Sequence, residues 1–141
     1  MTIVVGYIPT EEGSAAVDSA IAEAQRAAVL LIVVNTGHYG DFSHPTYASE
    51  QDVDALDAQL TAAGVEHEIR RPTDAGSAAD AILEAAAQSG AELIVIGIRR
   101  RSPVGKLLTG STAQQILLDA NCAVLAVKPR LRTAGLSPAS S

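Results

Sequence analysis

Aromatic residues are scarce in this chain of 141 residues, which contains no tryptophan and a single phenylalanine. Nearly half of its residues are nevertheless hydrophobic, so the core must be built from valine, isoleucine, leucine and alanine. Such an aliphatic core is typical of helices packed on a buried parallel sheet. The length suits one domain with a proper core.

Cysteine is nearly absent too, because Cys122 is the only one in the chain. A lone cysteine excludes a disulfide framework and a cysteine-rich metal site. Cys122 directly precedes the apolar run 123–127, and this position predicts a buried, unreactive thiol.

Long hydrophobic stretches are also missing. No apolar run approaches the roughly 20 residues that cross a bilayer, and no signal peptide precedes the first predicted strand. We therefore expect a soluble, cytoplasmic protein with no membrane partner. The folded domain is expected over residues 1–129. Residues 130–141 are rich in serine, proline, alanine and basic residues without periodicity, which predicts a disordered tail.

The net charge of −6 is distributed unevenly along the chain. Residues 1–98 hold 15 acidic residues against three basic ones, whereas residues 99–141 hold seven basic residues and one acidic residue. The acidic balance of the whole argues against nucleic acid as a partner. The basic C-terminal part could bind a small anion, or it could simply be a basic edge without a ligand.

Short apolar runs alternate with helical patterns along most of the chain. The runs predict strands over residues 2–7, 29–34, 65–70, 91–98 and 123–127. Apolar residues at helical spacing predict helices over residues 11–26, 50–63, 78–89 and 111–119. Thr10 and Ser77 are the expected N-caps of the first and third helices. The strand over residues 65–70 alternates polar and apolar residues, as an edge strand does, and its Glu66 and Glu68 should point away from His67.

The alternation of strands and helices predicts an α/β fold. Right-handed crossovers make it a doubly wound five-stranded parallel sheet of order 3-2-1-4-5, with helices on both faces. Ligands of such folds bind outside the carboxyl ends of the strands, at the switch point between strands one and four. The turn at residues 6–10 and the loop at residues 97–112 are therefore expected to meet at one crevice.

The stretch after the fourth strand combines features that suit an anion. An apolar run ends at Gly97, a basic loop follows over residues 99–106, and the Gly-Ser-Thr run 110–112 opens a helix. A cationic loop beside a polar helix N-terminus can hold a phosphate or another anion. Leucine rather than serine or threonine follows Lys106, so this is not a Walker P-loop. The alternative is a basic loop that faces only solvent.

The connection over residues 35–48 holds a second set of candidate ligands. His38, Asp41 and His44 could in principle bind a metal. They lack helical spacing and a third strong ligand, so packing of the loop is the preferred interpretation and no metal site is predicted.

Four stretches together resemble the universal stress protein (UspA-like) family, and the likeness covers residues 2–129. They are residues 3–6, 96–97, 99–112 and 123–129. The resemblance implies the Usp-type, adenine-nucleotide-hydrolase-like fold. It also implies a stress-response protein that binds ATP, with Mg²⁺, at the crevice between strands one and four. A homodimer through strand 123–127 is implied as well, since bare edge strands tend to pair.

Many nucleotide-binding members of this family carry Gly, two residues, Gly, nine residues, then Gly and Ser or Thr. Here Gly97, Gly110 and Ser111 match the pattern, and Arg100 stands at the second glycine. The Cβ of Arg100 can obstruct close approach of a phosphate, whereas its guanidinium can contact that phosphate. Ile8 stands where the ATP-binding branch has an acidic residue, so a polar anchor for the nucleoside is missing.

Carried over residue by residue, the resemblance implies a nucleotide-binding set from three segments of the chain. The set is Tyr7, Ile8, Pro9, Thr10, Val33, Val34, Gly97, Arg99, Arg100, Gly110, Ser111 and Thr112. Two other interpretations stay open. The departures at Ile8 and Arg100 favour a scaffold that acts through protein-protein contacts without a nucleotide. A nucleotide hydrolase ranks last, because no paired carboxylates or Ser-His-Asp set is visible near the crevice. We therefore expect no catalytic residues and a protein that is not an enzyme.

Overall fold

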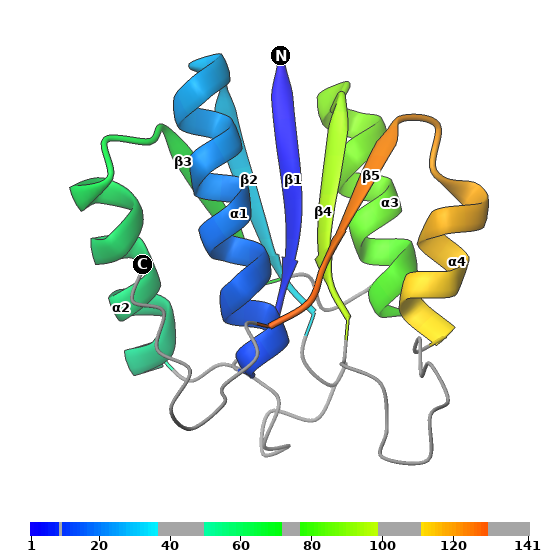
Figure 1. Cartoon of the computed structure of the whole chain (residues 1–141), viewed down its shortest axis with the longest axis horizontal. Helices are drawn as coiled ribbons and strands as arrows, with labels where there is room; N and C mark the ends of the chain where they lie inside the picture. The colour runs from blue at the N-terminus through cyan, green and yellow to red at the C-terminus, as the bar shows by residue number, and fades with distance from the viewer. Residues whose placement is uncertain (9, 37–49, 72–76, 99–110, 130–141) are drawn as a thin grey trace, which may run out of the picture.

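A computed structural model describes residues 1–8, 10–36, 50–71, 77–98 and 111–129 of the chain. Its five parallel strands stand in the order β3-β2-β1-β4-β5 (Figure 1). The strands are β1 (Thr2–Tyr7), β2 (Leu30–Asn35), β3 (His67–Arg70), β4 (Leu93–Gly97) and β5 (Ala123–Val127). The helices are α1 (Glu11–Ala27), α2 (Glu50–Ala62), α3 (Ala78–Ser89) and α4 (Ser111–Asp119). None of these four described helices is long and apolar enough to span a membrane.

Two helices cover each face of the sheet. α1 and α2 pack over one face, and α3 and α4 pack over the other (Figure 1). Side chains of the central strand β1 alternate between the two layers, so that Val5 enters the α1 layer and Val4 enters the α3 layer. The predicted order 3-2-1-4-5 and the doubly wound arrangement are thereby confirmed.

Both predicted N-caps are confirmed. The Thr10 hydroxyl accepts a hydrogen bond of 3.1 Å from the backbone N–H of Gly13, and the Ser77 hydroxyl accepts one of 3.1 Å from Asp80. Each bond satisfies a donor that the first helical turn would otherwise leave unpaired. α3 ends at Gly90, whose positive φ of 65° closes the helix in the left-handed conformation that glycine adopts readily.

Three strands begin later than the sequence predicts, and the reason is the same for all of them. Val29 N–H, just before β2, donates to the carbonyl of Ala24 at 3.2 Å. Val65 N–H donates to the carbonyl of Leu60 at 3.2 Å, and Ala91 N–H donates to the carbonyl of Ala86 at 2.9 Å. These apolar residues therefore close the preceding helices instead of starting the strands. An apolar run directly after a helix does not reveal which of its residues complete the helix terminus.

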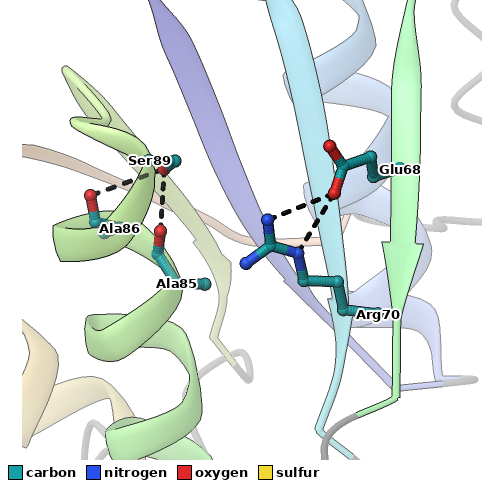
Figure 2. Close-up of polar contacts among 5 residues, drawn as sticks. All are labelled: Glu68, Arg70, Ala85, Ala86 and Ser89. Atoms are coloured by element: carbon teal, nitrogen blue, oxygen red, sulfur yellow. Dashed lines mark hydrogen bonds and ion pairs between the residues drawn. The ribbon is translucent and has the colours of Figure 1, made fainter.

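The predicted edge position of β3 is confirmed, and its outer side chains lie on the face that carries α3. Figure 2 shows Arg70 projecting from β3 beside Glu68. The Nη2 atom of Arg70 lies 3.1 Å from Oε1 of Glu68; Glu68 is exposed to solvent and Arg70 is half-buried. In the last turn of α3, the hydroxyl of Ser89 donates to the carbonyl of Ala85 at 2.7 Å (Figure 2). β3 and the end of α3 therefore border a charged, solvated margin on this face of the sheet.

Cys122 is only half-buried, so the predicted full burial of its thiol is wrong. The residue lies in the turn before the edge strand β5, where the sheet covers one side of it only. Burial still raises the pKa of the thiol. The reactive thiolate form is therefore disfavoured, in line with the predicted low reactivity.

His67 bridges β3 and α2 through both nitrogens of its ring. Nδ1 lies 2.8 Å from the carbonyl oxygen of Val65, and Nε2 lies 2.7 Å from a carboxylate oxygen of Asp57. Two acceptors suit an imidazolium, which donates from both nitrogens. The Val65 carbonyl first, and then the Asp57 carboxylate, raise the pKa of His67. The sequence did not reveal this contact, because Asp57 comes from a different element.

We expect this contact to make the stability depend on pH. The folded pKa of His67 lies above its unfolded value, so the stabilisation is fully present below about pH 6.5 and is lost as the pH rises through the folded pKa. Urea unfolding of the wild type and of Asp57→Asn should show it. The substitution should reduce the stability lost between mildly acidic and mildly alkaline pH, by at most about 1 kcal/mol for a solvent-screened pair. The exposed Asp54→Asn on the same helix is the control, and equal pH profiles for all three proteins would contradict the prediction.

Candidate functional site

The carboxyl ends of β1 and β4 lie side by side at the centre of the sheet. The register pairs Ile3 with Leu93 and Val5 with Val95 in the parallel direction. From this edge the chain continues from β1 into α1 on one face, whereas α4 follows β4 in the chain and covers the opposite face (Figure 1). This divergence is the predicted switch point, and it places the starts of the two candidate segments, Gly6 and Gly97, at one edge.

The turn after β1 is held tightly by its own backbone. Thr10 N–H donates to the carbonyl of Ile8 at 2.8 Å. A Cβ on Gly13 would lie 1.9 Å from that same carbonyl oxygen, so only glycine fits there. The hydroxyl of Thr10 caps α1 as described, which makes Thr10 first a structural residue of this turn. Pro9 lies outside the described residues.

Tyr7 ends β1 with its side chain buried in the α1 layer. Its carbonyl accepts a hydrogen bond of 3.0 Å from the N–H of Thr36, which ties the ends of β1 and β2 together. Burial and the nearby carboxylate of Asp52 raise the pKa of the Tyr7 phenol. The phenol is therefore neutral at physiological pH and can donate a hydrogen bond.

Gly97, at the end of β4, meets the first turn of α1. A Cβ at this position would lie 2.1 Å from the carbonyl oxygen of Glu12. The next residue, Ile98, donates its N–H to the carbonyl of Val127 at 2.8 Å and so pins the chain to the end of β5. Glycine is therefore required here to let strand and helix meet, whatever it does for a ligand.

Val33 and Val34 are fully buried, and their side chains belong to opposite layers of the core. They pack in the core at the end of β2, so only their backbone N–H and C=O groups could contact a polar ligand. Asn35 follows them, buried to 3 % exposure and in register with Tyr7. It is a polar side chain at the candidate edge that sequence reasoning missed. An amide at the end of an otherwise apolar run was the available signal.

The N-terminus of α4 lies at the same edge of the sheet as the carboxyl ends of the strands (Figure 1). The helix begins at Ser111, and Thr112 is partly buried in its first turn. Ala113 and the fully buried Ile116 anchor the helix in the α3 layer. Unpaired N–H groups at such a helix start favour an anion. Three further predicted residues, Arg99, Arg100 and Gly110, lie outside the described part of the chain.

A groove of about 330 Å³ lies beside this edge on the face that carries α3. Val34, Arg70 and Arg71 line one side of it, and the α3 residues Glu84 and Gln88 are among those that line the other. Each arginine lies next to a carboxylate, and an Arg71 nitrogen lies 2.5 Å from one of α2. The arrangement is a charged margin of the sheet that extends the candidate edge.

A metal centre is not apparent among the described residues, which contain no group of three histidine, cysteine, aspartate or glutamate side chains placed to hold an ion. The alternative that His38, Asp41 and His44 bind a metal falls on residues outside the described ranges. It stays a prediction from the sequence.

The fold defines an α/β protein with a candidate site at the switch point, and comparison with known proteins identifies its family. The chain belongs to the universal stress protein family, whose model matches residues 1–128. A universal stress protein of Mycolicibacterium smegmatis is 44% identical over 127 residues, which cover 90% of this chain and 97% of the relative.

Solved structures of similar proteins share the fold. A universal stress protein from Archaeoglobus fulgidus superposes with a TM-score of 0.72 at 29% identity, covering 91% of this chain and 98% of the other. A universal stress protein solved in complex with cAMP superposes with a TM-score of 0.68 at 25% identity, covering 92% and 98% of the two chains. The predicted family and fold are thereby confirmed.

Proposed function

We propose that the protein binds an adenine nucleotide, ATP in particular, in the crevice between the carboxyl ends of β1 and β4. The observation that supports the proposal is the pairing of β1 with β4, which brings the ends of these strands, Tyr7 and Gly97, to one edge of the sheet. The cAMP complex of a family member with 25% identity supports an adenine nucleotide as the ligand. The stress response is the proposed biological setting.

In this proposal the phosphates interact with the α4 end of the crevice. Backbone N–H groups of the first helical turn, with the hydroxyls of Ser111 and Thr112, would donate to the phosphate oxygens. Arg99 and Arg100 would add positive charge. Mg²⁺ would accompany the phosphates of ATP. Ile8 cannot accept a hydrogen bond from a ribose, so the phosphates should contribute more to the affinity than the nucleoside does.

We expect Thr112→Val to weaken ATP binding about tenfold, as the loss of a hydrogen bond to a charged group does. Isothermal titration calorimetry with ATP and Mg²⁺ measures this, and Thr61→Val, an exposed position on the far helix α2, is the matched control. Adenosine should bind more weakly than ATP by a larger factor than Thr112→Val alone produces. The proposal fails if millimolar ATP gives no saturable binding to the wild type.

A binding role rather than catalysis follows from the same arrangement, in our proposal. Donors that hold phosphates do not by themselves supply a general base for an attacking water. Nucleotide turnover that was lost in Ser111→Ala would contradict this view. The location we propose is the cytoplasm, on the sequence grounds given above.

We further propose a homodimer through the edge strand β5. Leu125 of this strand keeps 37% of its surface exposed, and Leu118 of the neighbouring helix α4 keeps 76%. Pairing of two copies would cover both the open strand edge and these side chains.

Sedimentation velocity should therefore show a wild-type dimer and a monomer for Leu125→Arg. Ala62→Arg, at an exposed position of α2, is the control and should remain dimeric. A monomeric wild type at high concentration would remove the homodimer from the proposal. The alternative, a scaffold that binds other proteins without a nucleotide, would then be tested only by the calorimetric titration with ATP.

A further inference from the structure

A groove of about 1070 Å³ runs along α1 on the opposite face of the sheet from the charged margin of β3. One face of α1 forms its length, with lining residues from Glu11 to Ala22 at helical spacing. The end of β5 and the residues after it, Val127 to Pro129, form another part of its wall. The groove is therefore bordered by the very segment from which the C-terminal residues leave the domain.

Acidic residues outnumber basic ones among the described residues that line this groove. Glu11 and Asp18 contribute carboxylates from α1, and Asp52 contributes one from α2, against the single positive charge of Lys128. Asp18 also accepts a hydrogen bond of 3.0 Å from the amide of Gln59, which holds this carboxylate in place between the two helices. A concave, negatively charged surface of this size fits a cationic segment.

The chain itself supplies such a segment. Twelve residues, 130–141, follow Pro129, and no acidic residue occurs after Asp119. Arg130 and Arg132 are the first and third of these residues. We propose that the start of the C-terminal tail, residues 130–132, docks in this groove of its own domain, with its arginines beside the carboxylates of Asp18 and Asp52.

The reach of the tail is sufficient for this docking. Three extended residues span roughly 10 Å, and the face of α1 from Glu11 to Ala22 is roughly 16 Å long at 1.5 Å per residue. A segment of this length that starts at the wall of the groove can therefore reach part of the acidic lining, and a short tether keeps the local concentration of its arginines in the millimolar range. Weak, solvent-screened ion pairs are sufficient at such a concentration. Regular structure in the tail is not needed.

This inference is separate from nucleotide binding, because it concerns the α1 groove and not the N-terminus of α4. Tyr7 and Thr10 of the predicted nucleotide-binding set also line the groove, but the docking is proposed at Asp18 and Asp52 and requires no nucleotide. A docked tail should therefore be detectable in the protein without any nucleotide.

Limited proteolysis with trypsin tests the proposal on the full chain. Release of residues 133–141 is followed by mass spectrometry at low ionic strength. Neutralising the groove with the double variant Asp18→Asn and Asp52→Asn should speed this release about fivefold, because cleavage tracks the population of the undocked tail. The matched control, Asp54→Asn with Glu92→Gln, removes the same charge at exposed positions outside the groove and should leave the rate unchanged.

Two outcomes would overturn the proposal. Equal rates for the groove variant and the control would show that the groove does not hold the tail. Protection that fell on dilution of the wild type would assign the docking to the tail of a second copy. High salt provides an independent arm, since it should speed release in the wild type and in the control but not in the groove variant. Circular dichroism would verify that each variant is folded before its rate is compared.

Discussion

Replacing Gly97 by alanine should lower the free energy of unfolding by about 3 kcal/mol, a cost in the range of overpacked interiors. The added methyl group would lie 2.1 Å from the carbonyl oxygen of Glu12, which is the backbone of the first turn of α1. Neither partner can yield by a simple side-chain rotation, because Gly97 belongs to the sheet and Glu12 belongs to a capped helix. Chemical unfolding in urea measures the loss as a lower midpoint with an unchanged slope.

Gly6→Ala is the matched control for this prediction. Gly6 lies at the same edge, on β1, but its added Cβ would meet the terminal methyl group of Ile82 at 2.6 Å. That group is the flexible end of a side chain, so a change of rotamer relieves the contact at a cost of about 1 kcal/mol. Equal losses for the two alanine variants would show that the contact between Gly97 and α1 is not the tight one.

Truncating Ile116 to alanine should destabilise the protein by about 3 kcal/mol, as large-to-small changes at buried positions do. Ile116 is fully buried, and it is the large apolar anchor through which α4 enters the core beneath it. The same change should weaken phosphate binding in the proposed crevice, because the N-terminus of α4 would lose its fixed position. Unfolding in urea and calorimetry with ATP give the two readouts.

Leu118→Ala is the control for Ile116→Ala, because it truncates a large apolar side chain of the same helix at an exposed position. Leu118 is two positions further along α4 and is 76% exposed, so its truncation should change the free energy of unfolding by less than about 0.5 kcal/mol. If it cost as much as Ile116→Ala, the described orientation of α4 would be wrong.

The sequence predicts the order of the strands and both N-caps because these depend on local chemistry and on the handedness of crossovers. β-branched runs such as that in β1, and hydroxyl side chains such as Thr10, act on their own neighbourhood. The first residues of β3 and β4 were predicted less accurately. Val65 and Ala91 are apolar like the strands, and only the backbone hydrogen bonds show that they close helices.

The candidate site was predicted less completely, because its contacts join residues that are distant in the chain. Gly97 was marked for a phosphate, and the structure adds the approach of Glu12, which no spacing rule contains. The contact between His67 and Asp57 and the burial of Asn35 likewise depend on residues that are distant in the chain. The roles of Arg99, Arg100 and Gly110 stay predictions that the nucleotide titrations address.

The pairing of β1 with β4 has a consequence for how the protein folds during synthesis. β1 pairs with β2 about one helix later, but its other neighbour starts at Leu93, 90 positions after its partner Ile3. Pairings of such long separation form slowly, because the intervening chain must first be closed into a loop. Until the ribosome has released β4, one edge of the central strand β1 has no partner. The edge at which we propose that a nucleotide binds therefore cannot form on the nascent chain before its last third has been made.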